Sequence, residues 1–215
     1  MRLRAYGVLI DLDGTLVDSR EAYREAAKRA FKTINLEFSE EAAFGIPKSL
    51  EQGLPLDRYM PRDKIKPFLD VYLSTYYELT GSLTKPFPNV YKTLEQLSMK
   101  AKLALLTMRF VSAESVRAEL EKFGIAKYFC CILTALNTSL PKPFPDGLLK
   151  CAELLGVNIR DCIVVGDSIA DVRAGKNSGA KTVAVLSGLF TREELEKENP
   201  DLILNSIKEL PDFLE

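Results

Sequence analysis

The sequence of 215 residues contains no histidine and no tryptophan. Without histidine, the chain cannot assemble a Ser-His-Asp or Cys-His nucleophile system, and it cannot bind zinc through imidazole. Any catalysis must therefore depend on carboxylates, lysine and a metal held by oxygen ligands.

A charge imbalance and long apolar runs are also missing. The formal net charge is -1, with 27% charged and 47% hydrophobic residues, so nothing recommends nucleic acid or an acidic membrane as a partner. Apolar runs such as residues 103–106 are too short to span a bilayer, and the N-terminus lacks a signal-peptide pattern. Only four cysteines occur. Their apolar neighbours, as at Cys130 and Cys131, predict reduced core thiols in a cytoplasmic protein.

The strongest local feature is the stretch of residues 8–16, an apolar run that ends in Asp11, Asp13 and Gly14. In an extended strand these two aspartates point to the same side. Two carboxylates so close together repel each other unless a cation compensates, which favours a bound divalent metal, most naturally Mg²⁺. A pair of solvated aspartates in a turn is the alternative for this stretch taken alone.

From residue 90 onward, amphipathic helices alternate with short apolar strands, a pattern that indicates a parallel sheet covered on both faces. We expect strands at 102–106, 129–133, 162–165 and 182–185, and helices at 90–97, 112–123, 145–155 and 168–177. Together with the strand that ends at Asp11, five strands are predicted.

About ninety residues separate the first two strands, whereas a βαβ crossover needs only about thirty. The excess predicts a helical insertion at residues 18–85 that folds as a cap over Asp11 and Asp13, with residues 1–17 and 86–215 forming the α/β core. Within the insertion we expect helices from Asp18 to about residue 34 and from about 63 to 80. The glycines and prolines of residues 44–62 predict broken helix or loop between them.

Polar residues follow four of the predicted strands, where open parallel sheets bind their ligands. They are Asp11 and Asp13, then Thr107, Met108 and Arg109, then Lys142, and finally Gly166, Asp167, Ser168 and Asp171. This set supplies a nucleophile, an acid/base, metal ligands and phosphate donors, as a phosphoryl-transfer site requires. Each has a plain structural alternative, such as a turn cap at Thr107, a solvated Lys142, or dipole-complementing aspartates.

Together these segments resemble the four motifs of the haloacid dehalogenase-like hydrolase superfamily, and they are most similar to its phosphoglycolate phosphatase-like branch. The resemblance covers essentially the whole chain. It implies a Rossmann-like three-layer core, with a five-stranded parallel sheet in the order 5-4-1-2-3, plus an inserted helical cap.

The resemblance also implies a Mg²⁺-dependent phosphatase that acts on small phosphorylated metabolites through an aspartyl-phosphate. By that resemblance Asp11 is the nucleophile and Asp13 the general acid/base, while Thr107 and Lys142 bind the transferring phosphoryl group. Mg²⁺ would be held by Asp11, Asp167 and the backbone carbonyl of Asp13. Asp171 would be either a further ligand or a support for the ligands.

Substrate identity is less clearly indicated, because Met108 and Arg109 stand where close phosphoglycolate phosphatases carry asparagine and lysine. We hypothesise that Lys48 and the planar fork of Arg109 bind the carboxylate of a phosphoglycolate-type substrate, with Met108 beside them. Solvated surface charge is the alternative for both cations. A phosphomutase of the same superfamily and a catalytically idle binding protein also stay open, and the sequence does not indicate an oligomeric state.

Overall fold

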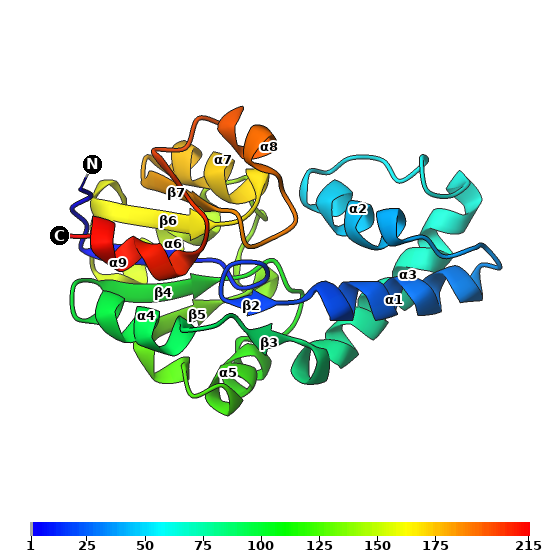
Figure 1. The fold of residues 1–215 in the computed structure, drawn as a ribbon, viewed down its shortest axis with the longest axis horizontal. Helices are drawn as coiled ribbons and strands as arrows, with labels where there is room; N and C mark the ends of the chain where they lie inside the picture. The colour runs from blue at the N-terminus through cyan, green and yellow to red at the C-terminus, as the bar shows by residue number, and fades with distance from the viewer. Residues whose placement is uncertain (1) are drawn as a thin grey trace. The chain divides into compact units, whose positions relative to one another are not determined.

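The computed structural model describes residues 2–215. The chain forms two compact units, the core (Met1–Val17 and Pro86–Glu215) and the helical unit (Asp18–Lys85). It passes from the core into the helical unit within β2 (Val17–Asp18) and returns within β3 (Lys85–Pro86), and these two short strands pair with each other (Figure 1). In the part of the chain described here, no helix is both long and apolar enough to cross a membrane.

The helical unit contains α1 (Arg20–Thr33), α2 (Glu40–Glu51) and α3 (Arg62–Leu83). In chain order, the core contains β1 (Gly7–Ile10), α4 (Val90–Ser98), β4 (Lys102–Leu106), α5 (Ala113–Lys122), β5 (Phe129–Leu133), α6 (Asp146–Leu155), β6 (Cys162–Gly166), α7 (Ile169–Ser178), β7 (Lys181–Val185), α8 (Arg192–Glu196), β8 (Leu202–Leu204) and α9 (Leu210–Phe213).

The core is a three-layer arrangement around a parallel sheet of order β5-β4-β1-β6-β7-β8 (Figure 1). Alternate residues of each strand face opposite layers. Val8 and Ile10 pack in one cluster with residues of α4, α5 and α9, whereas Leu9 packs in another with residues of α6 and α7. With β1 covered on both faces, its carboxyl end becomes the natural position for a site.

The predicted fold class is confirmed, and β4 and β5 have the predicted bounds. The five predicted strands, which are β1, β4, β5, β6 and β7, have the neighbours that the order 5-4-1-2-3 requires. The prediction of five strands was wrong by one, because β8 adds a sixth at the β7 edge. This strand has three residues and follows a charged helix and turn, so it lacks the run of alternating apolar residues on which strand prediction depends.

The prediction of broken helix or loop over residues 44–62 was wrong in its first half. Helix α2 continues through Gly45 and Pro47 to Glu51, and α3 likewise continues through Gly81 to Leu83. Buried residues of α2, including Ala43 and Ile46, pack in the apolar cluster of the helical unit. This packing outweighs the unfavourable local propensity of proline and glycine.

Two smaller expectations also changed. Helix α1 begins after Ser19 rather than at Asp18, whose carboxylate accepts a hydrogen bond from the Arg20 backbone at 3.1 Å. All four cysteines are free, and Cys151 and Cys162 are buried as expected, but Cys130 is exposed. Strand β5 lies at the edge of the sheet, so an alternate side chain there is not covered.

The aromatic cluster of the helical unit provides a test of its packing. Phe68 is fully buried, and its ring centroid lies 4.9 Å from that of Phe31 and 5.5 Å from that of Tyr72. We expect Phe68→Ala to lower the free energy of unfolding by about 3–5 kcal/mol, because it removes an aromatic side chain from a packed core. Urea denaturation measures the loss. The matched control is Leu73→Ala, which truncates an exposed residue of the same helix. An equal loss of stability in this control would contradict the special contribution of the buried Phe68 ring.

Candidate active site

Asp11 lies directly after β1, at the carboxyl end of the central strand. Its backbone N–H donates to the carbonyl of Val165 at 2.9 Å, which extends the pairing of β1 with β6 by one residue. The Asp11 side chain is 10% exposed. A carboxylate held so deeply at a strand end is positioned by the sheet rather than by a mobile loop.

Asp167 is enclosed by a close approach of two glycines. Gly14 has a φ of +82°, and a Cβ there would lie 2.5 Å from the Asp167 carboxylate. A Cβ on Gly188, in the segment after β7, would lie 1.6 Å from Asp167 Oδ2. Ser187 Oγ donates to the carbonyl of Gly14 at 2.7 Å and ties the two segments together. Only glycine permits this approach at either position.

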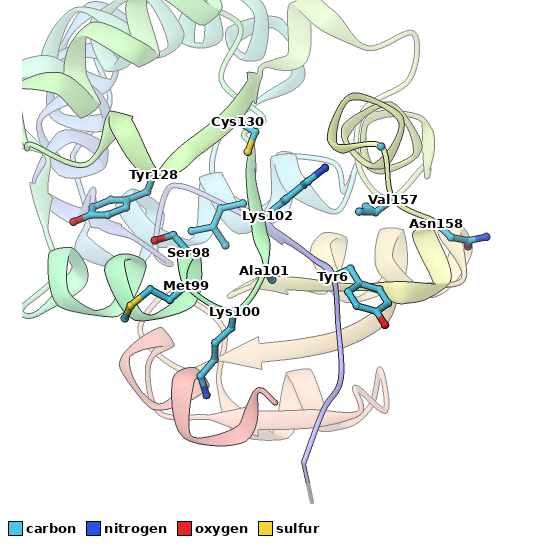
Figure 2. A pocket seen from close by; sticks show the side chains of 12 residues that line it. Tyr6, Ser98, Met99, Lys100, Ala101, Lys102, Tyr128, Cys130, Val157 and Asn158 are labelled. Carbon is cyan, nitrogen blue, oxygen red and sulfur yellow. The ribbon is translucent and has the colours of Figure 1, made fainter.

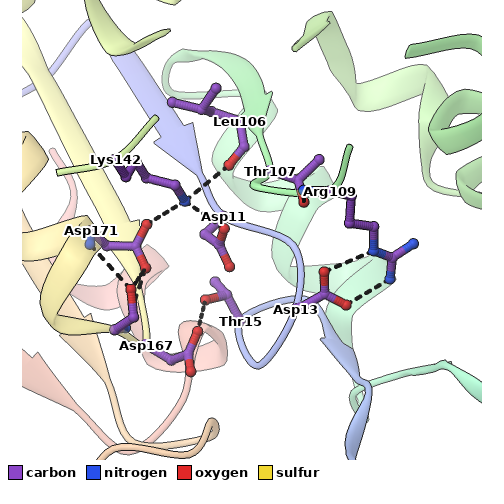
Figure 3. A network of polar contacts seen from close by, with 10 residues as sticks. Asp11, Asp13, Thr15, Leu106, Thr107, Arg109, Lys142, Asp167 and Asp171 are labelled. Atoms are coloured by element: carbon purple, nitrogen blue, oxygen red, sulfur yellow. Dashed lines mark hydrogen bonds and ion pairs between the residues drawn. The ribbon is translucent and has the colours of Figure 1, made fainter. Parts of the chain in front are cut away.

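Lys142 links two carboxylates that come from different strand ends. Its Nζ lies 2.7 Å from Asp11 Oδ1 and 2.6 Å from Asp171 Oδ1, and it also donates to the Leu106 carbonyl at 3.3 Å (Figure 3). Asp171 is fixed in turn by Ser168, whose Oγ donates to Asp171 Oδ2 at 2.6 Å and caps α7. Lys142 and Asp171 are buried, so these are ion pairs shielded from solvent.

Burial and charge act in opposite directions on this cluster. Burial raises the pKa of Asp11, and although Lys142 lowers it, the nearby charge of Asp171 adds to the rise, so the pKa reaches about 7. For Lys142, burial alone would lower the pKa, but the two carboxylates outweigh burial and raise it above its ordinary value. Lys142 therefore stays protonated, and the cluster holds more negative charge than one ammonium can neutralise.

The arrangement fits a metal ion. Asp11, Asp167 and Asp171 each offer a carboxylate oxygen within 4.8 Å of the others, and all three residues are buried. The donor set is entirely of hard oxygen atoms, which Mg²⁺ prefers. A divalent cation would offset the excess negative charge, and the glycine-lined surroundings of Asp167 leave its carboxylate bordered by backbone. The Asp13 carboxylate does not belong to this group.

Asp13 points instead toward Arg109, which follows β4 (Figure 3). Arg109 donates from Nε to Asp13 Oδ2 at 2.8 Å and from Nη2 to Asp13 Oδ1 at 2.6 Å. The remaining guanidinium nitrogen, Nη1, donates to Glu119 Oε2 of α5 at 2.5 Å. Arg109 is 3% exposed, so its fork engages protein carboxylates within the core.

The other predicted residues fall into two groups. Thr107 is buried at the end of β4, and its Oγ1 accepts a hydrogen bond from the Arg109 backbone at 3.2 Å. Thr107, Met108 and Lys142 line one small hollow of the core. Lys48 lies half-buried in α2 of the helical unit and is not among the residues that the core brings together.

A larger hollow, of about 700 Å³, lies at the amino ends of the strands (Figure 2). It is lined by residues such as Tyr6, which precedes β1, and Lys102, which begins β4, and it has no acidic lining residue. Lys102 Nζ donates to the Leu155 carbonyl at 2.7 Å. This hollow at the amino ends of the strands therefore lacks the acidic groups that phosphoryl transfer needs.

Sequence reasoning missed several contributors to the site. Glu119, Thr15 and the segment 187–189 all contact predicted site residues, and Thr15 Oγ1 lies 3.3 Å from Asp167 Oδ1. A signal existed only for Glu119, which occupies a buried position of α5 beside Val116 and Leu120. A carboxylate on the apolar face of a helix indicates a buried partner.

Comparisons with known proteins agree with this geometry. The sequence model of the haloacid dehalogenase-like hydrolases matches residues 8–185. A phosphoglycolate phosphatase of Aquifex aeolicus is 32% identical over 206 residues, which cover 94% of this chain and 93% of that protein. The pyrophosphatase PpaX of Oceanobacillus iheyensis is 30% identical over 208 residues, which cover 94% of each chain.

Among solved structures, the haloacid dehalogenase-like hydrolase SP0104 of Streptococcus pneumoniae superposes with a TM-score of 0.82 at 22% identity, covering 97% of this chain and 98% of that one. This likeness concerns the fold. The sequence match extends over most of the chain and includes Asp11, Asp13, Thr107, Lys142 and Asp167. The chain therefore belongs to the haloacid dehalogenase-like hydrolases, and its curated relatives are named as phosphatases.

Proposed function

We propose that this chain is a Mg²⁺-dependent phosphatase that hydrolyses small phosphomonoesters through an aspartyl-phosphate on Asp11. The observation that carries the proposal is the buried cluster in which Lys142 bridges Asp11 and Asp171 while Asp167 completes a set of three carboxylates. A nucleophile, a fixed cation and metal ligands converge at the carboxyl ends of the neighbouring strands β1 and β6. An idle binding protein has no need of such a costly concentration of buried charge.

Asp11 begins the reaction by attacking phosphorus, so that the bond to the leaving oxygen breaks and an acyl phosphate forms. Lys142 balances negative charge as the phosphoryl group approaches. Asp11, Asp167 and Asp171 would hold Mg²⁺, with the Asp13 backbone carbonyl as a further ligand, and the ion would supply additional charge stabilisation. Thr107 is expected to donate to a phosphoryl oxygen.

Asp13 is proposed to transfer protons in both half-reactions. It gives a proton to the leaving oxygen, and it then accepts one from the water that attacks the acyl phosphate. Hydrolysis of the acyl phosphate releases phosphate and regenerates the Asp11 carboxylate. The helical unit, inserted five residues after Asp13, is expected to act as the cap that selects the substrate.

A phosphoglycolate-type acid is the substrate that we favour, and the name of the Aquifex aeolicus relative supports it. Pyrophosphate is a second candidate, supported by the name of the Oceanobacillus iheyensis relative. Both are small anions with a transferable phosphoryl group. A phosphomutase would use the same core residues and differs in returning the phosphoryl group to a sugar rather than to water.

A phosphate-release screen tests the proposal across small phosphorylated acids, sugar phosphates, nucleotides, pyrophosphate and an aryl phosphate. We expect Mg²⁺-dependent turnover that Asp11→Asn abolishes, because this change removes the nucleophile with little change in shape. The control is Asp161→Asn, which alters an exposed carboxylate just before β6. Substantial turnover by homogeneous Asp11→Asn protein would remove the nucleophile assignment, and a preference for sugar phosphates would remove the favoured substrate class.

The metal ligands are tested by titrating Mg²⁺ calorimetrically into the metal-free variants. We expect Asp167→Asn to weaken Mg²⁺ binding more than Asp171→Asn does, because the oxygens of Asp171 are already hydrogen-bonded by Lys142 and Ser168. In the wild type, Mg²⁺ at a hundred times its Kd should stabilise the fold by about 2.7 kcal/mol. A reversed order of affinities would overturn the ranking.

The raised pKa of Asp11 predicts a pH-dependent stability of the metal-free protein. Between pH 3.8 and about 7, the folded protein keeps a proton that the unfolded chain has lost, so stability falls as pH rises through this window. We expect the thermal midpoint of chelator-treated wild type to fall more steeply between about pH 4 and about pH 7 than that of Asp11→Asn, which lacks the titrating group. Equal slopes would contradict the raised pKa.

A further inference from the structure

We propose that Arg109 and Glu119 are positioning residues, which hold the Asp13 carboxylate in place for proton transfer. This inference rests on the proposed phosphatase function and assigns Arg109 a role different from binding a substrate carboxylate. The proposed mechanism itself does not use Glu119.

The geometry of the Asp13–Arg109 pair is that of a clamp. Two parallel N–H donors, Nε and Nη2, meet the two oxygens of the Asp13 carboxylate at 2.8 and 2.6 Å. A bidentate pair of this kind fixes the plane of the carboxylate as well as its position. Asp13 follows β1 and forms an isolated bridge with Val17 just before a turn, and the contact with Arg109 orients its side chain.

Glu119 in turn fixes the guanidinium of Arg109. Its Oε2 accepts from Arg109 Nη1 at 2.5 Å, and the side chain is 7% exposed. Helix α5 anchors Glu119 through its buried neighbours Val116 and Leu120. Helix α5 thereby fixes the orientation of Asp13 through Glu119 and Arg109.

Burial makes the clamp a lasting feature rather than a contact that a substrate displaces. The Arg109 side chain is 2% exposed, and that of Asp13 is 12% exposed. A substrate carboxylate that took the guanidinium would leave Asp13 without its bidentate partner in a poorly hydrated position, and such a loss is strongly unfavourable. Each Asp13 oxygen keeps a second lone pair on which the transferred proton can be carried, so a fixed acid/base is the role that fits these contacts.

The test compares Arg109→Lys and Glu119→Gln with the control Glu121→Gln, which changes an exposed carboxylate of the same helix. Lysine keeps the charge but loses the fork. We expect Arg109→Lys to lower kcat by about tenfold to a hundredfold, as small displacements of catalytic groups do. Glu119→Gln should lower kcat less, and Glu121→Gln should match the wild type. KM and the inhibition constant of inorganic phosphate should stay within about twofold in all three.

All rates are corrected for the folded fraction, which urea denaturation measures. A kcat loss that disappears after this correction would show that Arg109 and Glu119 only stabilise the fold, and it would overturn the inference. A raised KM with kcat retained would overturn it as well, since it would place Arg109 on the substrate. If the wild type released no phosphate from any compound of the screen, the proposed function itself would fail, which is a distinct result.

A double-mutant cycle with Asp13→Asn gives a second readout, using an aryl phosphate whose leaving group needs little protonation. If Arg109 acts through Asp13, Arg109→Lys should have almost no further effect on kcat once Asp13 is Asn. The same loss in both backgrounds would show that Arg109 acts independently of Asp13 and would overturn the inference. If Asp13→Asn turnover falls below detection, the separation of kcat from KM in the single variants decides the question.

Discussion

The ion pairs of Lys142 with Asp11 and Asp171 are the interaction on which the rest of the site depends. Three carboxylates converge on the end of a parallel sheet, where both faces are covered by helices and water is scarce. Without a buried cation, their mutual repulsion and desolvation would oppose folding at this point. Lys142 removes part of this opposition, and the remaining negative charge is what a divalent metal, as proposed, would offset.

A second buried cation, Arg109, serves the neighbouring carboxylate in a different manner. Lys142 is a compact charge that bridges Asp11, which follows β1, and Asp171 of α7, whereas Arg109 is a planar group that orients one acid against a helix. The two aspartates that follow β1 thus pair with different cations, although they are only two residues apart. In the proposed mechanism, one of these carboxylates attacks phosphorus while the other transfers protons.

Much of the core could be predicted from the sequence, because strands such as β4 and β5 are short apolar runs between recognisable helix ends. The site residues at the strand ends could also be predicted, because parallel strands bring their carboxyl ends to one edge of the sheet. The errors have a common cause in contacts between distant segments. Pro47 is tolerated inside α2 by packing, and β8 is a strand only because β7 provides its partner. The approach of Gly188 to Asp167 spans 21 residues and has no local signature.

The chain enters the helical unit through β2 and leaves it through β3, and because these two strands pair, the two ends of the insertion lie next to each other. An insertion with neighbouring ends places no threading constraint on the sheet, so its length and internal structure can vary without changing strand order. Residues 18–85 could therefore be replaced by another helical segment without a change in strand order. Transplanting another helical segment between residues 17 and 86 would leave the charged cluster of the core in its own sequence context. With the helical unit selecting the substrate, as proposed above, substrate range and phosphate chemistry could evolve separately.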